Sequence, residues 1–353
     1  MTSHPPVLEE DFLAQLLVDA PPAIAVLLIP SFFAYLSIYA LVRRWVWTGR
    51  LLVVPTLVLF WASKVVAPVR CRALEAEFNF GAAIAIMKLL ELHVLEFTNA
   101  FPSYTGGKQP RPSLLALILF TELRYESFTP NPIRPWQLPK YPFSSSPEKR
   151  RFFYSEPIQW VIHVSIFILL QCLPQHILPV KALGIIFAIW NIWTALELVL
   201  RYRNSPPLFG PIYLADSLAT FWTETWHNAL AGPCLSLAYM PTTFILSRLR
   251  LPRSLVRSCA IVASFALMGV FHMYAMAPIL SDEGMRRIVI FFVANGVCTV
   301  IEVAFWGKKR HWVRAVIAWT IELSLASWTV AKCQVADGVL SADWRGLCRA
   351  KVP

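Results

Sequence analysis

Two histidines stand out in this sequence because few other groups near them could do chemistry. His227 belongs to the stretch FWTETWHN, residues 221–228, and His272 lies in the apolar run SFALMGVFHMYAMAP, residues 264–278. In apolar surroundings an imidazole is expected to stay neutral at pH 7, and a neutral imidazole can act as general base toward a hydroxyl group. The alternative for His272 is a histidine held in the core by a hydrogen bond.

The residues around His227 have the types expected of a pocket at the edge of a membrane. Aromatic side chains would form its walls, a carboxylate lies beside them, and an amide could stabilise a tetrahedral oxyanion. Tryptophan also gathers at membrane–water interfaces, so an aromatic belt explains the two tryptophans equally well. The residues concerned are Phe221, Trp222, Glu224, Trp226 and Asn228.

Polar residues inside the apolar runs are candidates for function, because an ionisable group in lipid is costly. His163 in QWVIHVSIF is explained by an interhelical hydrogen bond. Buried packing partners and proton donors are both open interpretations for the glutamates. The full set is Lys64, Lys88, Glu91, His93, His163, Asn191, Glu197, Asn228, His272, Asn295, Glu302 and Glu322.

The elements that must position these residues are membrane helices. Of the 353 residues, 57% are hydrophobic and 15% charged, whereas an ordinary soluble domain has about 25% charged residues. A span needs about 20 apolar residues, and backbone groups in lipid must bond internally. We therefore expect a single all-α domain, 1–353, a transmembrane bundle of eight or nine spans. The expected spans are 24–42, 51–66, 80–98, 157–173, 183–200, 255–276, 288–306 and 315–330, with 229–246 as the ninth.

The segment 229–246 is expected either to cross the membrane or to re-enter. Gly232, Pro233 and Pro241 would break a regular helix there. The positive-inside rule places the basic connections on the cytosolic side, and all of them fit there only if 229–246 does not cross. One of these connections, residues 99–156, is long and rich in proline, and a loop of that length is usually functional.

The charge and cysteine content limit the kinds of ligand and partner that this chain is expected to bind. The net charge of +11 is concentrated between the spans, where it would anchor the chain against anionic headgroups, with a smaller part available to a phosphate-bearing substrate. No basic motif on a soluble domain favours nucleic acid. The seven cysteines are scattered singly, and no Cys/His spacing indicates zinc, so we expect no metal.

The stretch DSLATFWTETWHN, residues 216–228, resembles the first motif of the wax synthase family of the membrane-bound O-acyltransferase superfamily. FALMGVFH, residues 265–272, resembles the second motif of that family, an apolar helix that ends in histidine. The similarity is strongest over 210–275 and faint over 120–140.

The resemblance implies transfer of an acyl group from acyl-coenzyme A, a co-substrate rather than a bound cofactor, to an alcohol. By this resemblance His272 is the catalytic histidine, and His227 with Asn228 forms the polar pair that orients the donor. Phe221, Trp222 and Trp226 would wall the pocket.

One departure from the family pattern concerns the donor phosphates. Relatives commonly carry glycine and basic residues where this chain has Thr223, Glu224 and Thr225. The phosphate contact is therefore expected at Arg201, Arg203 or the basic cluster 134–151, or the donor preference has changed.

Size and divergence resemble the fungal enzymes that acetylate terpenoids and other lipophilic secondary metabolites, which favours an acetyl donor. We expect a multi-pass protein of the endoplasmic reticulum membrane, of unspecified oligomeric state. The alternatives are a membrane-embedded terpene cyclase, with Glu197, Glu302 or Glu322 as proton donor, and a transporter, which would predict internal repeats.

Overall fold

The computed structural model describes residues 12–129, 131, 154–200, 207–226, 229–307 and 311–333, and nearly all of its regular structure is helical. A single two-stranded antiparallel ladder pairs Ser103 with Thr129 and Tyr104 with Phe128. The long helices are α1 (Phe12–Val42), α2 (Val46–Val66), α3 (Arg72–Phe97), α6 (Glu156–Gln171), α7 (Leu178–Leu200), α11 (Arg253–Met276), α12 (Asp282–Trp306) and α13 (Trp312–Val330). The short elements are β1 (Ser103–Tyr104), α4 (Pro112–Thr121), β2 (Phe128–Thr129), η1 (Ile212–Leu214), α8 (Leu218–Thr220), η2 (Phe221–Thr225), α9 (Ala231–Pro233), η3 (Cys234–Tyr239) and α10 (Met240–Arg248).

The outer faces of the long helices are apolar, as expected of surfaces that meet lipid. On α2 the large side chains of Val54, Val58 and Trp61 are exposed, and they follow one another at helical spacing. The opposite face of α2 buries Thr56 and Ser63. This inversion of the soluble pattern indicates a helix whose polar side faces the protein and whose apolar side faces lipid.

Seven helices in the described residues are long and apolar enough to cross a membrane, so the chain is an integral multi-pass membrane protein. They are Ala14–Val42, Val46–Val66, Arg72–Phe97, Leu178–Val199, Arg253–Met276, Asp282–Trp306 and Trp312–Val330. The expected count of eight or nine spans is not confirmed.

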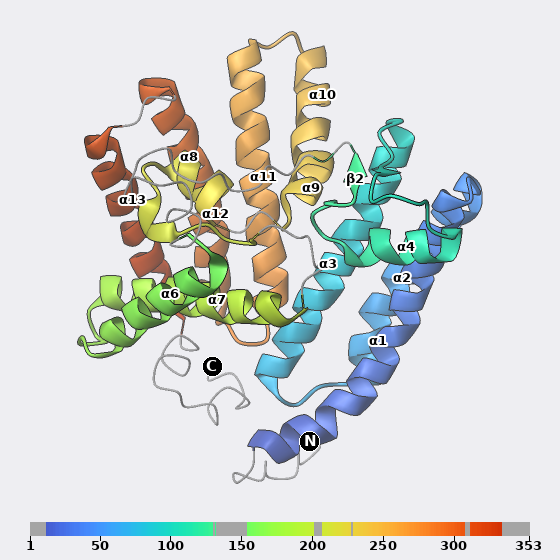
Figure 1. The fold of residues 1–353 in the computed structure, drawn as a ribbon, viewed down its shortest axis with the longest axis horizontal. Helices are drawn as coiled ribbons and strands as arrows, with labels where there is room; N and C mark the ends of the chain where they lie inside the picture. The colour runs from blue at the N-terminus through green and yellow to red at the C-terminus, as the bar shows by residue number, and fades with distance from the viewer. Residues whose placement is uncertain are drawn as a thin grey trace.

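Two expected spans account for the difference. The run 157–173 forms α6, whose 16 residues reach about 24 Å at 1.5 Å per residue, less than the hydrocarbon core of about 30 Å. The run 229–246 is divided among α9, the π-helical η3 and α10. In Figure 1, α6 and α7 run crosswise on the left side of the view, above the level of the turn between α2 and α3, while α10 and α11 run side by side to the upper end of the molecule.

Close packing of α11 against α12 depends on two glycines. A Cβ at Gly296 would lie 2.9 Å from the Phe265 side chain, and a Cβ at Gly269 would lie 3.1 Å from the Val289 Cα. Small residues let membrane helices approach closely in this way. The approach brings the His272 end of α11 against Phe292 of α12.

Candidate active site

His272 lies on α11 among aromatic side chains. Its ring stacks on Phe292 of α12, with centroids 4.5 Å apart, and it meets the edges of Phe271 and of Phe80 from α3. Its residue is partly rather than fully buried. The imidazole is therefore held in place by three rings while one part of its surface remains accessible.

The hydrogen bond of His272 defines which ring nitrogen carries the proton. Nδ1 lies 2.8 Å from the carbonyl oxygen of Met268, one turn earlier on α11. A carbonyl oxygen can only accept, so Nδ1 must donate, and in the neutral ring Nε2 then keeps a free lone pair. This tautomer presents the basic nitrogen required of a general base.

Trp222 lies on η2, where Trp226 N donates to the Phe221 carbonyl at 2.7 Å in a π-helical turn. π-turns occur frequently at functional sites. The Trp222 indole N–H donates to Oδ1 of Asn295 on α12 at 3.3 Å, and its ring packs on Phe265 and Phe292. The indole is therefore fixed by α11 and α12 together.

Trp222 and His272 share one neighbour, Phe292. The centroid of the Phe292 ring lies 5.6 Å from Trp222 and 4.5 Å from His272. The structure thus brings the tryptophan stretch and the histidine helix, which are separate in sequence, to one aromatic cluster.

The other predicted pocket residues divide between the core and the surface. Phe221 is buried, stacks on Trp226 with centroids 5.6 Å apart, and meets Trp319 of α13 edge-on. Trp226 is half-buried and Glu224 is exposed. Phe221 is thus part of the support for Trp222, whereas Glu224 faces outward from the cluster.

Four of the predicted site residues lie outside the described residues. They are His227, Asn228, Arg201 and Arg203. Their roles stay predictions, as does that of the basic cluster 134–151, all of which lies outside the described residues as well.

A buried carboxylate holds the backbone at the start of residues 218–226, the segment that carries Trp222. Glu302 of α12 accepts hydrogen bonds from the backbone N–H groups of Leu218 and Ala219, at 2.9 and 3.1 Å. Arg314 of α13 pairs with the same carboxylate at 3.1 Å, and both charged groups are buried. The negative charge at the first turn of α8 stabilises the helix start and fixes where η2 begins.

A second, partly buried ion pair holds the chain just before η1. Glu197 of α7 accepts from Arg124 at 2.7 Å and from the backbone N–H of Leu208 at 2.8 Å. Arg124 also donates to the Pro207 carbonyl at 3.0 Å. Glu197 and Glu302 were candidate proton donors by sequence, and the structure places both in ion pairs that anchor the site segment.

Glu322 differs from these two glutamates. It is 2% exposed on α13, faces the Trp222 indole, and has one oxygen, Oε2, with no hydrogen-bond partner among the described residues. Its place beside Trp222 makes it part of the support of the site.

The sequence contained only part of this arrangement. Asn295 and Glu302 stood out as polar residues in an apolar helix, but their partners could not be named because contacts between distant segments leave no local pattern. Arg314 was not among the polar residues singled out in the sequence, and Phe292 had no distinguishing feature.

The cluster lies in a segment of the chain that matches a protein-family model. Residues 205–294 match the model of the membrane bound O-acyl transferase family. This range runs from just before η1 into α12 and includes both Trp222 and His272.

Three relatives from Arabidopsis thaliana illustrate the similarity. Probable long-chain-alcohol O-fatty-acyltransferase 7 is 26% identical, over 58% of this chain and 62% of its own length. Probable long-chain-alcohol O-fatty-acyltransferase 9 is 24% identical, over 70% of this chain and 79% of its own length. Acyl-CoA–sterol O-acyltransferase 1 is 29% identical over 36% of this chain and 39% of its own length. The first of these alignments thus spans less than two thirds of the relative.

The family model matches the segment that forms the site, and the relatives make the chain similar to wax synthase-like members of the membrane-bound O-acyltransferase family. They agree with the resemblance of the two sequence motifs.

Proposed function

We propose that this chain transfers an acyl group from acyl-coenzyme A to the hydroxyl group of a lipophilic alcohol, with His272 as general base. The observation that carries the proposal is the common packing of His272 and Trp222 on Phe292, inside the segment that matches the acyltransferase family. The names of the relatives support acyl transfer in general.

The proposed reaction proceeds without a covalent acyl-enzyme. Nε2 of His272 accepts the hydroxyl proton while the alcohol oxygen forms a bond to the thioester carbonyl carbon, which gives a tetrahedral oxyanion. The oxyanion collapses, the carbon–sulfur bond breaks, and the thiolate of coenzyme A takes the proton back from the imidazolium. A base placed in this way contributes about 10²–10⁴-fold to the rate.

His227 and Asn228 are proposed to orient the donor, and the amide of Asn228 to stabilise the oxyanion. The Trp222 N–H is less suited to that role because it already donates to Asn295. Phe221 and Trp226 are proposed to support the pocket wall. Glu224 is proposed to contact substrate at the outer edge.

The donor phosphates need positive charge, and Arg201 and Arg203 are the proposed contacts. The donor is proposed to be acetyl-coenzyme A and the acceptor a terpenoid or other lipophilic secondary metabolite, as for the fungal enzymes that the chain resembles in size and divergence. The proposed location is the endoplasmic reticulum membrane. The named relatives define the competing donor, a long-chain fatty acyl group.

A comparison of donors and acceptors tests the proposal. Microsomes that contain the chain are incubated with labelled acetyl-coenzyme A or palmitoyl-coenzyme A, each with a long-chain alcohol, a sterol and terpenoid alcohols. We expect labelled ester from acetyl-coenzyme A with a terpenoid alcohol. If ester forms only from palmitoyl-coenzyme A, the donor is a long-chain acyl-coenzyme A and not acetyl-coenzyme A. If no pair gives ester, the proposal of acyl transfer is contradicted.

A further inference from the structure

A cavity of about 270 Å³ lies between α1, α2 and the beginning of α3, and His272 is not among its lining residues. Its wall includes the apolar side chains of Leu27, Phe60, Phe78 and Ala82. Basic residues line it as well, namely Lys64, Arg70 and Arg72. A cavity with both kinds of lining fits a molecule that has an anionic group and a hydrocarbon part.

The basic residues exceed the nearby acidic ones. Arg72 pairs with Glu75, the one acidic residue of the lining, at 3.4 Å. In the part of the chain that the structure describes, the side chains of Lys64 and Arg70 have no carboxylate partner. The cavity therefore keeps a positive charge that an anion would neutralise.

Asp19 of α1 lies close to this turn and offsets one further charge, so the three basic side chains Lys64, Arg70 and Arg72 still exceed the two carboxylates of Asp19 and Glu75. Its Oδ2 accepts hydrogen bonds from the backbone N–H groups of Arg70 and Cys71, at 2.8 and 2.9 Å. The carboxylate is 7% exposed and shapes the turn between α2 and α3. The Arg70 side chain is exposed and lines the cavity.

The cavity lies at the end of two candidate membrane spans, since α2 ends at Val66 and α3 begins at Arg72. Helix ends mark the boundary between hydrocarbon and water, which is where phosphate headgroups are found. In Figure 1 this turn lies at the lower end of the molecule, near the N-terminus.

We propose that this cavity binds the phosphate group of an acyl-bearing amphiphile. The phosphate would lie against Lys64 and Arg70, and the hydrocarbon part against Phe60 and Leu27. Two sources carry that chemistry, an anionic phospholipid and the acyl-coenzyme A donor, and the second case rests on the proposed function. The volume is far smaller than a whole coenzyme A, so the donor would place only part of itself here.

The wall of the cavity is connected to the helix of His272. The Lys64 Nζ lies 4.0 Å from the centroid of the Tyr274 ring, and Asn79 donates to the Tyr274 carbonyl at 3.5 Å. Phe80, the next residue on α3, packs against His272. An occupant that binds Lys64 would therefore sit next to the contact between α3 and the catalytic end of α11.

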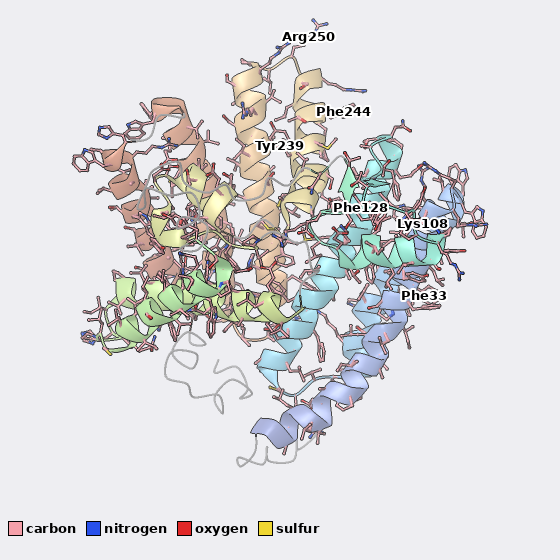
Figure 2. The ribbon with its side chains drawn as sticks, in the orientation of Figure 1. Phe33, Lys108, Phe128, Tyr239, Phe244 and Arg250 are labelled. Atoms are coloured by element: carbon pink, nitrogen blue, oxygen red, sulfur yellow. The ribbon has the colours of Figure 1, made fainter. Side chains whose placement is uncertain are left out.

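Lipid binding by the purified full chain in detergent tests the inference. The probes are dioleoylphosphatidylglycerol, the zwitterionic dioleoylphosphatidylcholine, and the unreactive desulfo-coenzyme A, with binding measured by native mass spectrometry. The test variant is K64Q/R70Q. The matched control is R248Q/R250Q, which removes two charges from the turn between α10 and α11, where Figure 2 shows Arg250 at the upper tip of the molecule.

We expect K64Q/R70Q to bind phosphatidylglycerol, desulfo-coenzyme A or both at least tenfold more weakly than wild type, and the control to bind both as wild type does. The probe that is affected identifies the source of the phosphate. If wild type and both variants bind phosphatidylglycerol equally and also bind desulfo-coenzyme A equally, the inference is overturned. If K64Q/R70Q binds phosphatidylglycerol more weakly but the wild-type protein makes no ester, the inference stands and only the proposed function is contradicted.

Discussion

Two histidines of this chain share one local geometry but differ in their surroundings. His163 and His272 each place Nδ1 on the carbonyl of the residue four positions earlier, at 2.7 and 2.8 Å. His163 is 0% exposed and stacks on Trp190 with centroids 3.6 Å apart. His272 remains partly accessible. The same free Nε2 is therefore sealed in one helix and available in the other, which favours His272 as the base.

Substitution of Glu322 distinguishes the proposed acyltransferase from the alternative function, a membrane terpene cyclase. Glu322→Gln keeps the shape and one acceptor oxygen beside Trp222, so acyl transfer should stay within about threefold of wild type. The measurement is labelled ester formed per folded molecule. A proton-donating carboxyl would behave otherwise, since its loss should reduce turnover by about 10²–10⁴-fold. A loss of that size in Glu322→Gln would contradict a supporting role for this residue.

At the scale of elements, hydropathy predicted the long helices but not how the site segment is held. The apolar runs that became α1, α2, α3, α7, α11, α12 and α13 were recognisable from composition. The run of α6 is as apolar as theirs, and its shortness follows from Ser155 and Pro157 at its start and the turn after Gln171. The ion pairs of Glu302 and Glu197 depend on residues far away in sequence, which a pattern of hydropathy does not contain.

The contact between α11 and α12 determines the position of both Trp222 and His272. In Gly296→Ala the new methyl group would meet Phe265, which itself packs on Trp222. We expect a loss of about 1–3 kcal/mol of stability from overpacking, together with lower activity. The measurement is thermal unfolding of the purified protein in detergent.

Gly81→Ala is the matched control for this prediction, because a Cβ at Gly81 of α3 meets nothing within 4 Å. Its unfolding midpoint should equal or exceed that of wild type, since alanine favours the helix. If both alanine variants unfold at the same temperature, close packing at Gly296 does not hold the two helices.

At the scale of the whole molecule, the site lies where segments from both halves of the chain meet. The rings around His272 come from α3, α11 and α12. The segment 207–226, which carries Trp222, is anchored by hydrogen bonds to α7, α12 and α13. The two motifs could be recognised in the sequence from their resemblance to one family. The sequence could not predict Phe292 as their meeting point, because one phenylalanine in an apolar helix looks like any other.

The proposed reaction joins a water-soluble thioester to a lipid-soluble alcohol, so both would have to be held at a membrane boundary. Apolar outer faces on the helices and a polar, ion-paired interior around the site satisfy that demand. Bringing the two reactants into one geometry removes much of the barrier, and the base then completes the reaction.

The most direct test of His272 as the general base measures ester formation from labelled acyl-coenzyme A and an accepted alcohol. It compares the ester formed per folded molecule by wild type, His272→Gln and His163→Gln. We expect His272→Gln to lose about 10²–10⁴-fold in turnover. His163→Gln should yield less folded protein but keep wild-type turnover in the molecules that fold. Turnover by His272→Gln equal to that of wild type would contradict the central claim that His272 is the base.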